Sequence, residues 1–271
     1  MENIMTKYED LLKILSSYGS VAIAFSGGVD STFLLYAAKE ALGEKTMAVT
    51  VSSAFIPQSE MREADEFCAK IGVKQVVLEV DTLSIPGISN NPKDRCYICK
   101  KNIFGNIIET ARENGIDVVA EGSNTDDDND YRPGMKAIRE LGVKSPLKEA
   151  GLSKAEIREL SRKFDLPTWD KPSFACLASR FVYGEQLSAS KLSMVERAEE
   201  FLRGLGLKQF RVRIHGDENF LARIELPTDE IGGALFAEDR KKISERFKEL
   251  GFAYVTIDLD GYRTGSMNVG V

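Results

Sequence analysis

Ser26-Gly27-Gly28-Val29-Asp30-Ser31 is the stretch that decides the fold. It follows a continuous apolar run at residues 21–25, which predicts a strand buried on both faces of a parallel sheet. It precedes residues 30–41, where apolar side chains recur at helical spacing. Glycines let the backbone approach a phosphate closely, and a helix N-terminus offers unpaired N–H groups and the positive end of its dipole. The stretch therefore predicts a phosphate-binding loop between a buried strand and a helix.

This loop is not of the Walker A kind, because no Lys-Ser or Lys-Thr pair closes it. Asp30 and Ser31 stand where a helix N-cap is expected, so a capped glycine turn without a ligand is the alternative interpretation. The whole string resembles the PP-loop of the ATP pyrophosphatase superfamily. That resemblance implies that Ser26, Gly27, Gly28, Asp30 and Ser31 hold the phosphates of ATP. It also implies that Asp30 helps to place Mg²⁺, which prefers carboxylate and phosphate oxygens.

Strands and helices alternate along the first two thirds of the chain, which predicts a doubly wound parallel α/β sheet. After about residue 175 the pattern changes to that of a smaller α+β domain. We therefore expect a PP-loop ATP-binding domain at residues 1–175 and a substrate-binding, sulfur-transfer domain at residues 176–271. Further strands are predicted at 47–51, 76–80, 118–120, 209–215, 220–226 and 253–259, and further helices within 1–18 and at 57–71, 99–114, 153–164, 188–204 and 238–250.

Ligands of doubly wound sheets lie at the carboxyl ends of the strands. Val51 ends one predicted strand and Gly122 follows another. We therefore expect both residues at the nucleotide, with Val51 lining the adenine pocket. The acidic loop GSNTDDDNDYRPG occupies residues 122–134. Acidic side chains close to a triphosphate need a cation, and we assign Asp126 to Mg²⁺. A solvated loop whose acids cap the next helix is the alternative interpretation.

Composition favours a cytoplasmic protein with reduced thiols. The chain has 271 residues, a net charge of −6, four cysteines and one histidine. Neither part of the chain is basic, which argues against a nucleic-acid partner, and no apolar run approaches the ~20 residues of a membrane helix. Without a secretion signal, four cysteines do not indicate a disulfide framework. A homo-oligomer is compatible with the sequence.

Cys96 and Cys99 form a CxxC pair at the start of a predicted helix, where the helix dipole and basic neighbours favour thiolates. Alone, the pair fits a redox couple, half of a zinc site or two ligands of a cluster. Cys176 lies in KPSFACLASR, residues 171–180, at the expected domain junction. Three thiolates on a cubane iron–sulfur cluster leave one iron open, whereas zinc needs a fourth ligand. Cys68 has apolar neighbours and is expected in the core.

The predicted strand at 209–215 alternates, so that its arginines and His215 face away from its apolar side chains. Cross-strand ion pairing with Glu225 is the alternative interpretation, but one carboxylate cannot neutralise the three arginines of the two strands. Arginine is well suited to bidentate contact with phosphate. The predicted ligands of a substrate phosphate are Ser179, Arg180, Arg211 and Arg213.

Four spaced motifs resemble the LarE family of ATP-dependent sulfur transferases nearly from end to end: SGGVDS, the loop at 122–134, KPSFACLASR and LDGYRTGSMN at 259–268. The resemblance implies that ATP adenylates a pyridinium carboxylate mononucleotide, which then becomes a thiocarboxylate of the nickel-pincer nucleotide cofactor of lactate racemase. Some members sacrifice the cysteine at the position of Cys176. Others also carry CxxC and bind a [4Fe–4S] cluster whose open iron carries the sulfide.

The three-cysteine pattern of this chain matches the second kind of member. The resemblance therefore implies a [4Fe–4S] cluster on Cys96, Cys99 and Cys176, beside ATP and Mg²⁺, with Cys176 and Asp30 as catalytic residues. It leaves open the source of the sulfide and the role of the terminal motif.

Three rival functions remain at this point. A tRNA thiolation enzyme of the PP-loop class is the runner-up, and the lack of a basic RNA-binding region weighs against it. An amide-forming synthetase of the NAD or GMP kind has no use for three grouped cysteines. A nucleotide sensor without catalysis would bind ATP without exchanging pyrophosphate.

Overall fold

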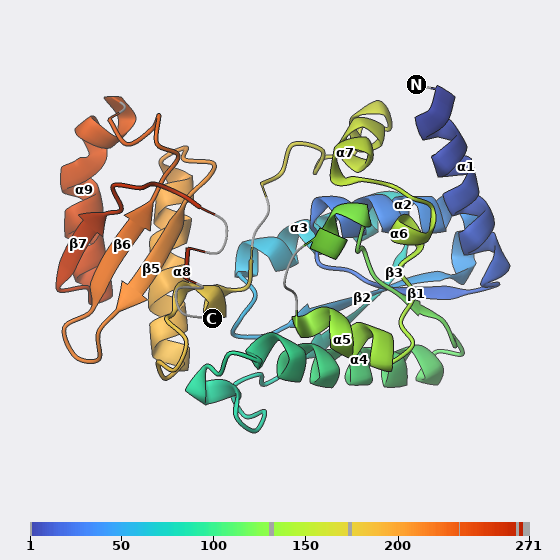
Figure 1. Cartoon of the computed structure of the whole chain (residues 1–271), viewed down its shortest axis with the longest axis horizontal. Helices are drawn as coiled ribbons and strands as arrows, with labels where there is room; N and C mark the ends of the chain where they lie inside the picture. Colours follow the sequence, from blue (N-terminus) through green and yellow to red (C-terminus); the bar gives the residue numbers. More distant parts are fainter. Residues whose placement is uncertain (1, 130–132, 173–174, 233, 264–265, 268–271) are drawn as a thin grey trace. The chain divides into compact units, whose positions relative to one another are not determined.

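The computed structural model describes residues 2–129, 133–172, 175–232, 234–263 and 266–267 (Figure 1). Parts of three motifs lie outside the described residues: 130–132, 173–174, and 264–265 with 268. The chain forms two compact units. The first comprises Met1–Asp81 and Asp94–Phe174, and the second comprises Thr82–Lys93 and Ala175–Val271. No helix in the described part of the chain is long and apolar enough to cross a membrane.

The first unit contains a four-stranded sheet in the order β3-β2-β1-β4, and all its strand pairs are parallel. The parallel α/β class expected from the sequence is thereby confirmed. An isolated parallel bridge from Ala120 to Lys144 continues the sheet beyond β4. The strands are β1 (Val21–Ala24), β2 (Thr46–Ser52), β3 (Lys74–Glu79) and β4 (Val119–Ala120).

Helices cover both faces of this sheet, which makes it doubly wound (Figure 1). Val21 and Ile23 pack in one cluster with α1, α2, α3 and α7, whereas Ala22, Met47 and Val49 pack in another with α4 and α5. The helices are α1 (Glu2–Ser17), α2 (Val29–Leu42), α3 (Gln58–Ile71), α4 (Arg95–Glu113), α5 (Pro133–Glu140), α6 (Pro146–Glu149) and α7 (Lys154–Lys163), with 3-10 turns η1 (Gly43–Lys45) and η3 (Thr125–Asn129).

The strand order creates a switch point beside β1. From β1 the chain moves outward through β2 to β3 and then returns to place β4 on the other side of β1. Ligands of doubly wound sheets bind where the order reverses, outside the carboxyl ends of the strands. The loops after β1 and β4 are therefore the ones that must meet at this edge.

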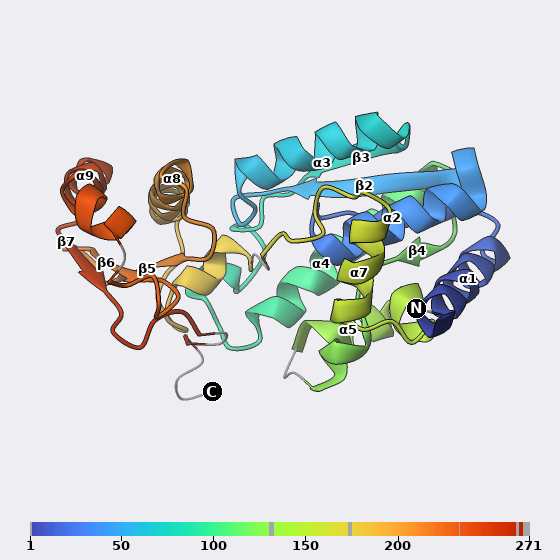
Figure 2. The same ribbon diagram turned by 90° about the horizontal axis from the view of Figure 1, so that it is seen from above.

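The second unit contains the three-stranded sheet β5-β6-β7, with β5 and β6 antiparallel and β6 and β7 parallel. Helices α8 and α9 lie on one side of it (Figure 2). The segment at 82–93 belongs here although it precedes α4, because Asn91 donates to the carbonyl of Val182 at 2.6 Å. The elements are η2 (Ile88–Asn90), η4 (Leu177–Arg180), α8 (Ala189–Gly204), β5 (Arg211–His215), β6 (Leu221–Glu225), α9 (Ala234–Leu250) and β7 (Tyr254–Ile257).

Both faces of β5 are buried, and not only the apolar face that the predicted alternation places in the core. The apolar face is buried as expected, with Val212 and Ile224 fully covered. The opposite face is also covered, because Arg211 is 2% and Arg213 5% exposed. These arginines therefore belong to a buried polar network rather than to a solvated basic surface.

Candidate functional site

The phosphate loop makes a tight turn into α2. Gly27 has a φ of +68°, a left-handed conformation that favours glycine. Gly28 is the N-cap, so the expectation that Asp30 or Ser31 fills this position is wrong, and both lie in the first turn. The Ser31 hydroxyl donates to the Gly28 carbonyl at 3.2 Å and lies 3.1 Å from the Ser26 hydroxyl. Hydroxyl and backbone groups of all five predicted ATP-phosphate ligands are thus gathered at one helix N-terminus.

The loop after β4 packs directly against this turn. A Cβ added to Gly122 would lie 3.0 Å from the backbone nitrogen of Ser31 and 3.2 Å from the Cβ of Asp30. Asn124 reaches the Asp30 carboxylate through its side-chain amide at 3.4 Å. The two loops at the switch point therefore touch, and glycine at position 122 is what permits the approach.

Gly122→Ala is expected to weaken ATP binding roughly tenfold, because overpacking of about 1–3 kcal/mol would push the two loops apart. Titration calorimetry with a non-hydrolysable ATP analogue measures this change. Gly105→Ala in α4 is the matched control, since a Cβ there meets nothing within 4 Å. Wild-type affinity in Gly122→Ala would contradict the placement of the nucleotide at this edge.

Asp30 already has a cationic neighbour. The Lys154 ammonium, from the first residue of α7, forms an ion pair with the Asp30 carboxylate. The backbone N–H of Lys154 donates to the Asp126 carboxylate at 3.0 Å. Asp126 thus contacts the start of α7, as the helix-capping interpretation would have it, although α7 is not the next helix after the loop. Its assignment to Mg²⁺ stays a prediction.

Lys154 was missed by the sequence analysis. Ser153 and Glu156 form a capping box around the start of α7, and this pattern is legible in the sequence as a helix N-terminus. It locates the helix, but nothing local to it indicates that its first side chain meets Asp30, 124 residues earlier.

A second lysine, Lys171, contacts the phosphate loop at Gly27. The Lys171 ammonium donates to the Gly27 carbonyl at 3.0 Å and to the carboxylates of Glu60 and Glu63 at 2.8 and 2.6 Å. Its side chain is mostly buried. Lys171 is the first residue of the KPSFACLASR motif, so the start of that motif contacts the phosphate loop.

Val51 lies at the end of β2 and is buried in the core that faces α4 and α5, where it shares a cluster with Phe104 and Ile107. Its backbone reaches the carboxyl edge of the sheet, since β2 ends at Ser52. The adenine contact remains a prediction.

Cys96 and Cys99 lie within the first five residues of α4 and are partly exposed, as the helix-start expectation requires. Residues three apart lie on the same side of a helix. The turn is fastened to α5, because the Tyr97 hydroxyl donates to Glu140 at 2.7 Å. A Cβ on Gly134 would lie 3.3 Å from the carbonyl oxygen of Cys96. The CxxC turn is thus held by α5, an element that the sequence analysis did not predict.

Cys176 is exposed and forms the N-cap of η4. Cys68 is buried, as expected, and burial raises the pKa of its thiol to about 12, so it remains a neutral core residue. All four cysteines lie in the described part of the chain and none forms a disulfide. Among the described residues, no group of three or more His, Cys, Asp and Glu side chains is arranged to hold a metal ion.

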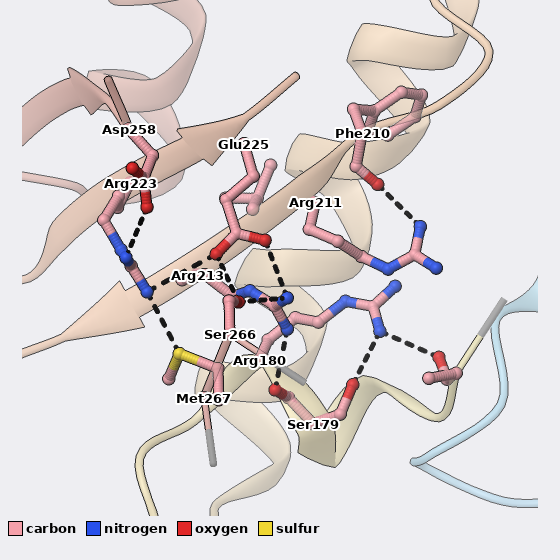
Figure 3. A network of polar contacts seen from close by, with 12 residues as sticks. Ser179, Arg180, Phe210, Arg211, Arg213, Arg223, Glu225, Asp258, Ser266 and Met267 are labelled. Atoms are coloured by element: carbon pink, nitrogen blue, oxygen red, sulfur yellow. Dashed lines mark hydrogen bonds and ion pairs between the residues drawn. The ribbon is translucent and has the colours of Figure 1, made fainter. Parts of the chain in front are cut away.

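Arg180 is fully buried and its donors are directed into the protein. Its Nε and Nη2 bond to the Glu199 carboxylate at 2.8 and 2.9 Å. Its Nη1 donates to the carbonyls of Ala175 and Cys176. The same nitrogen donates to the Ser179 hydroxyl at 2.8 Å (Figure 3). A phosphate would have to displace these contacts. We therefore withdraw Arg180 from the predicted phosphate ligands, because its guanidinium instead holds the turn that carries Cys176.

The other predicted phosphate residues do gather around it (Figure 3). Arg213 donates to the Ser179 carbonyl at 2.9 Å and to Glu225 at 2.7 Å, and its buried Nε has no hydrogen-bond partner. Arg211 donates to the Phe210 carbonyl at 2.7 Å. Burial, followed by the like charge of Arg180, lowers the pKa of Arg211 to about 10, so it stays charged at neutral pH.

The ion-pair interpretation of the arginines is confirmed at Glu225, and the phosphate interpretation stays a prediction. Arg213 does pair with Glu225, and Arg223 bonds to Asp258 at 2.6 Å. Of the described side chains in this network, four guanidinium groups face three carboxylates, which leaves one net positive charge. Its members are Arg180, Arg211, Arg213, Arg223, Glu199, Glu225 and Asp258.

His215 borders this network as a neutral group. Burial, then the charges of Arg223 and Arg213, lower the pKa of His215 below its ordinary value. Its Nε2 accepts a hydrogen bond from Arg223 Nε at 3.2 Å, which requires that this nitrogen carry no proton. The one histidine of the chain thus helps to orient an arginine.

Comparison with known proteins identifies the relatives of this arrangement. The pyridinium-3,5-bisthiocarboxylic acid mononucleotide synthase of Lactiplantibacillus plantarum, a LarE protein, is 38% identical over 269 residues, which cover 99% of this chain and 96% of that protein. The chain belongs to the LarE family. As a LarE-family protein it is an enzyme that uses ATP and transfers sulfur.

Other comparisons agree with the LarE assignment. Residues 20–112 match the family described as queuosine biosynthesis protein QueC, a stretch that includes the phosphate loop. An uncharacterized protein of Synechocystis is 39% identical over 97% of this chain and 97% of its own. A tRNA-specific 2-thiouridylase of Rickettsia rickettsii is 25% identical over 60% of this chain and 54% of its own, so the similarity to tRNA thiolation enzymes is distant.

Proposed function

We propose that this LarE-family enzyme adenylates a carboxylate of a pyridinium mononucleotide and converts it to a thiocarboxylate in nickel-pincer nucleotide biosynthesis. The observation that carries the proposal is the turn at Cys176. There one buried arginine holds the carbonyl of the cysteine, while Arg211 and Arg213, with a net positive charge around them, lie close by in the same unit. The arginine network can thus bind an anionic substrate and also hold the turn that carries the Cys176 thiol.

The first half-reaction uses the phosphate loop. A carboxylate oxygen of the substrate attacks the α-phosphorus of ATP, and pyrophosphate leaves. Ser26, Gly27, Gly28 and Ser31 receive the phosphates at the start of α2, where N–H groups point outward. The Lys154 ammonium, held by Asp30, offsets negative charge on the leaving pyrophosphate. Val51 and Gly122 line the nucleotide.

Asp30 and Asp126 are the proposed ligands of Mg²⁺, which neutralises phosphate oxygens when it is bound. Carboxylates are the donors that Mg²⁺ prefers. The two side chains fit this role because both contact the same residue, Lys154, one through its ammonium and one through its backbone N–H. Lys154 would then release Asp30 to the metal and contact the phosphates.

In the second half-reaction a sulfide attacks the acyl carbon, AMP leaves, and a thiocarboxylate remains. Arg211, Arg213 and Ser179 are the proposed ligands of the substrate's 5′-phosphate. Arg180 instead positions Cys176. A phosphate placed among these groups would satisfy the buried Nε of Arg213 and the net positive charge of the network.

Cys96, Cys99 and Cys176 are the proposed ligands of a [4Fe–4S] cluster, which when bound offers one open iron to an exogenous sulfide. The residues fit this group because their thiols form no disulfide and are partly or fully exposed. We place the enzyme in the cytoplasm, where thiols stay reduced.

Pyrophosphate exchange tests the proposal. We expect exchange between pyrophosphate and ATP only when pyridinium-3,5-dicarboxylic acid mononucleotide is present. Arg211→Ala is expected to raise the KM for the mononucleotide roughly tenfold or more and to leave the KM for ATP unchanged. Arg240→Ala, an exposed arginine of α9, is the matched control. Exchange that requires tRNA instead of the mononucleotide would favour tRNA thiolation, and equal effects of Arg211→Ala on both KM values would contradict the phosphate assignment.

A further inference from the structure

The terminal motif folds back onto the second unit. The backbone N–H of Tyr262 donates to the Leu226 carbonyl, directly after β6, at 2.7 Å. Gly261 makes the preceding turn with a φ of +71°, and a Cβ there would lie 2.7 Å from the same carbonyl oxygen. Only glycine therefore fits this turn, and the backbone bond of Tyr262 holds the chain beside the end of β6. We call residues 261–263 and 266–267 the C-terminal segment.

This segment meets a different arginine with each of three side chains, and Figure 3 shows two of the three, Ser266 and Met267. The Tyr262 ring centre lies 5.1 Å from the guanidinium carbon of Arg211. Ser266 accepts from Arg213 Nη2 at 3.0 Å and donates to Glu225 at 2.7 Å. In the same way, the Met267 sulfur lies 3.1 Å from Arg223 Nη2. The contacts of the segment are thus concentrated on the arginine network.

The kind of contact at Arg211 matters for ligand binding. An aromatic face attracts the guanidinium plane and fixes its orientation, while one of the Arg211 N–H groups donates to the Phe210 carbonyl at 2.7 Å. Arginine side chains also lose much rotamer freedom on binding, and a side chain held in place beforehand loses less.

We propose that the C-terminal segment is a positioning element of the substrate site, in which Tyr262 orients Arg211 and Ser266 orients Arg213 toward the substrate's phosphate. The inference rests on the proposed function, because it explains how the arginines assigned to the substrate's phosphate are oriented before the substrate binds. Tyr262 and Ser266 act through the arginines and are positioning residues.

Tyr262→Leu keeps an apolar side chain but removes the aromatic face. We expect it to raise the KM for the mononucleotide roughly tenfold in the exchange assay, while the KM for ATP and the melting temperature stay close to wild type. Tyr262→Phe, which keeps the face, is expected to restore a KM close to wild type. An unchanged mononucleotide KM in Tyr262→Leu, or equal increases of both KM values, would overturn the inference.

NMR of the arginine Nε–H groups gives a second readout that needs no substrate. The ring current of Tyr262 displaces the Arg211 resonance, which Arg211→Lys identifies by its disappearance. We expect that displacement to vanish in Tyr262→Leu and to persist in Tyr262→Phe. An Arg211 resonance that does not respond to Tyr262→Leu would overturn the positioning role. A wild-type enzyme that shows these shifts but no mononucleotide-dependent exchange would overturn the proposed function and leave the positioning role supported.

Discussion

Glu199→Ala is expected to lower the free energy of unfolding of the second unit by about 3–5 kcal/mol. The Glu199 carboxylate is almost fully buried on α8, where it bonds to Arg180 at 2.8 and 2.9 Å and accepts the backbone N–H of Val212 at 3.0 Å. Removing it leaves a buried guanidinium without its counter-charge and a strand N–H without a partner. Denaturant unfolding followed by circular dichroism measures the loss.

Two further variants show whether the lost stability comes from the unpaired buried charge or from a change in the helix α8. Glu200→Ala removes the exposed neighbour on the same helix and is expected to change the free energy of unfolding by less than about 0.5 kcal/mol. Replacing both partners, Arg180→Met with Glu199→Leu, is expected to recover much of the stability, because neither buried charge remains. A loss below about 1 kcal/mol in Glu199→Ala would show that the pair is not buried as described.

The free energy of unfolding should also fall at low pH, because the Glu199 carboxylate becomes protonated. Burial alone would raise the pKa of Glu199, but its bonds to Arg180 and to the Val212 N–H outweigh burial and hold the pKa below its ordinary value. A carboxyl with a lowered folded-state pKa contributes stability above its unfolded-state pKa and loses it as the pH falls through the folded-state pKa. The wild type should therefore lose more stability than Glu199→Ala at the acid end of a pH series.

The phosphate loop and the parallel sheet were predictable because their determinants are local. A buried strand, a glycine turn and a helix start follow one another within residues 21–41, and this order alone indicates what the segment does. The contacts that complete the site are not local. Lys154 meets Asp30 and Lys171 meets Gly27 across 124 and 144 residues, and only the strand order brings them together.

The arginines illustrate a second limit of sequence reasoning. Alternation along β5 correctly separated the arginines from the apolar face, but it could not distinguish an arginine held by a carboxylate from one held by an aromatic ring. Arg213 meets Glu225 from β6, and Arg211 meets Tyr262 from near the end of the chain. Both partners come from elements with their own independent patterns. The helix α5, which begins at a proline and holds the CxxC turn, was missed because it spans only about two turns.

Cys176→Ser is expected to reduce thiocarboxylate formation to background while mononucleotide-dependent pyrophosphate exchange continues. The serine keeps the size of the side chain and the carbonyl that Arg180 holds, so the turn at η4 should persist. Adenylation depends on the phosphate loop in the first unit, which contains no part of this turn. Product mass and exchange are measured on the same preparation. Loss of both activities together would contradict the separation of the two half-reactions.

Iron content and the fate of the cysteine then decide how Cys176 acts. Anaerobically purified wild type is expected to hold about four irons per chain, and Cys96→Ala and Cys176→Ser to lose them. Cys68→Ala is the matched control, because its buried thiol should not bind the cluster. A ligand survives turnover, so the mass of the peptide that contains Cys176 should stay unchanged over many cycles when sulfide is supplied. Conversion of Cys176 to dehydroalanine after a single turnover would instead make it a sacrificial donor and remove the cluster from the proposed mechanism, while the ATP chemistry of the phosphate loop would be unaffected.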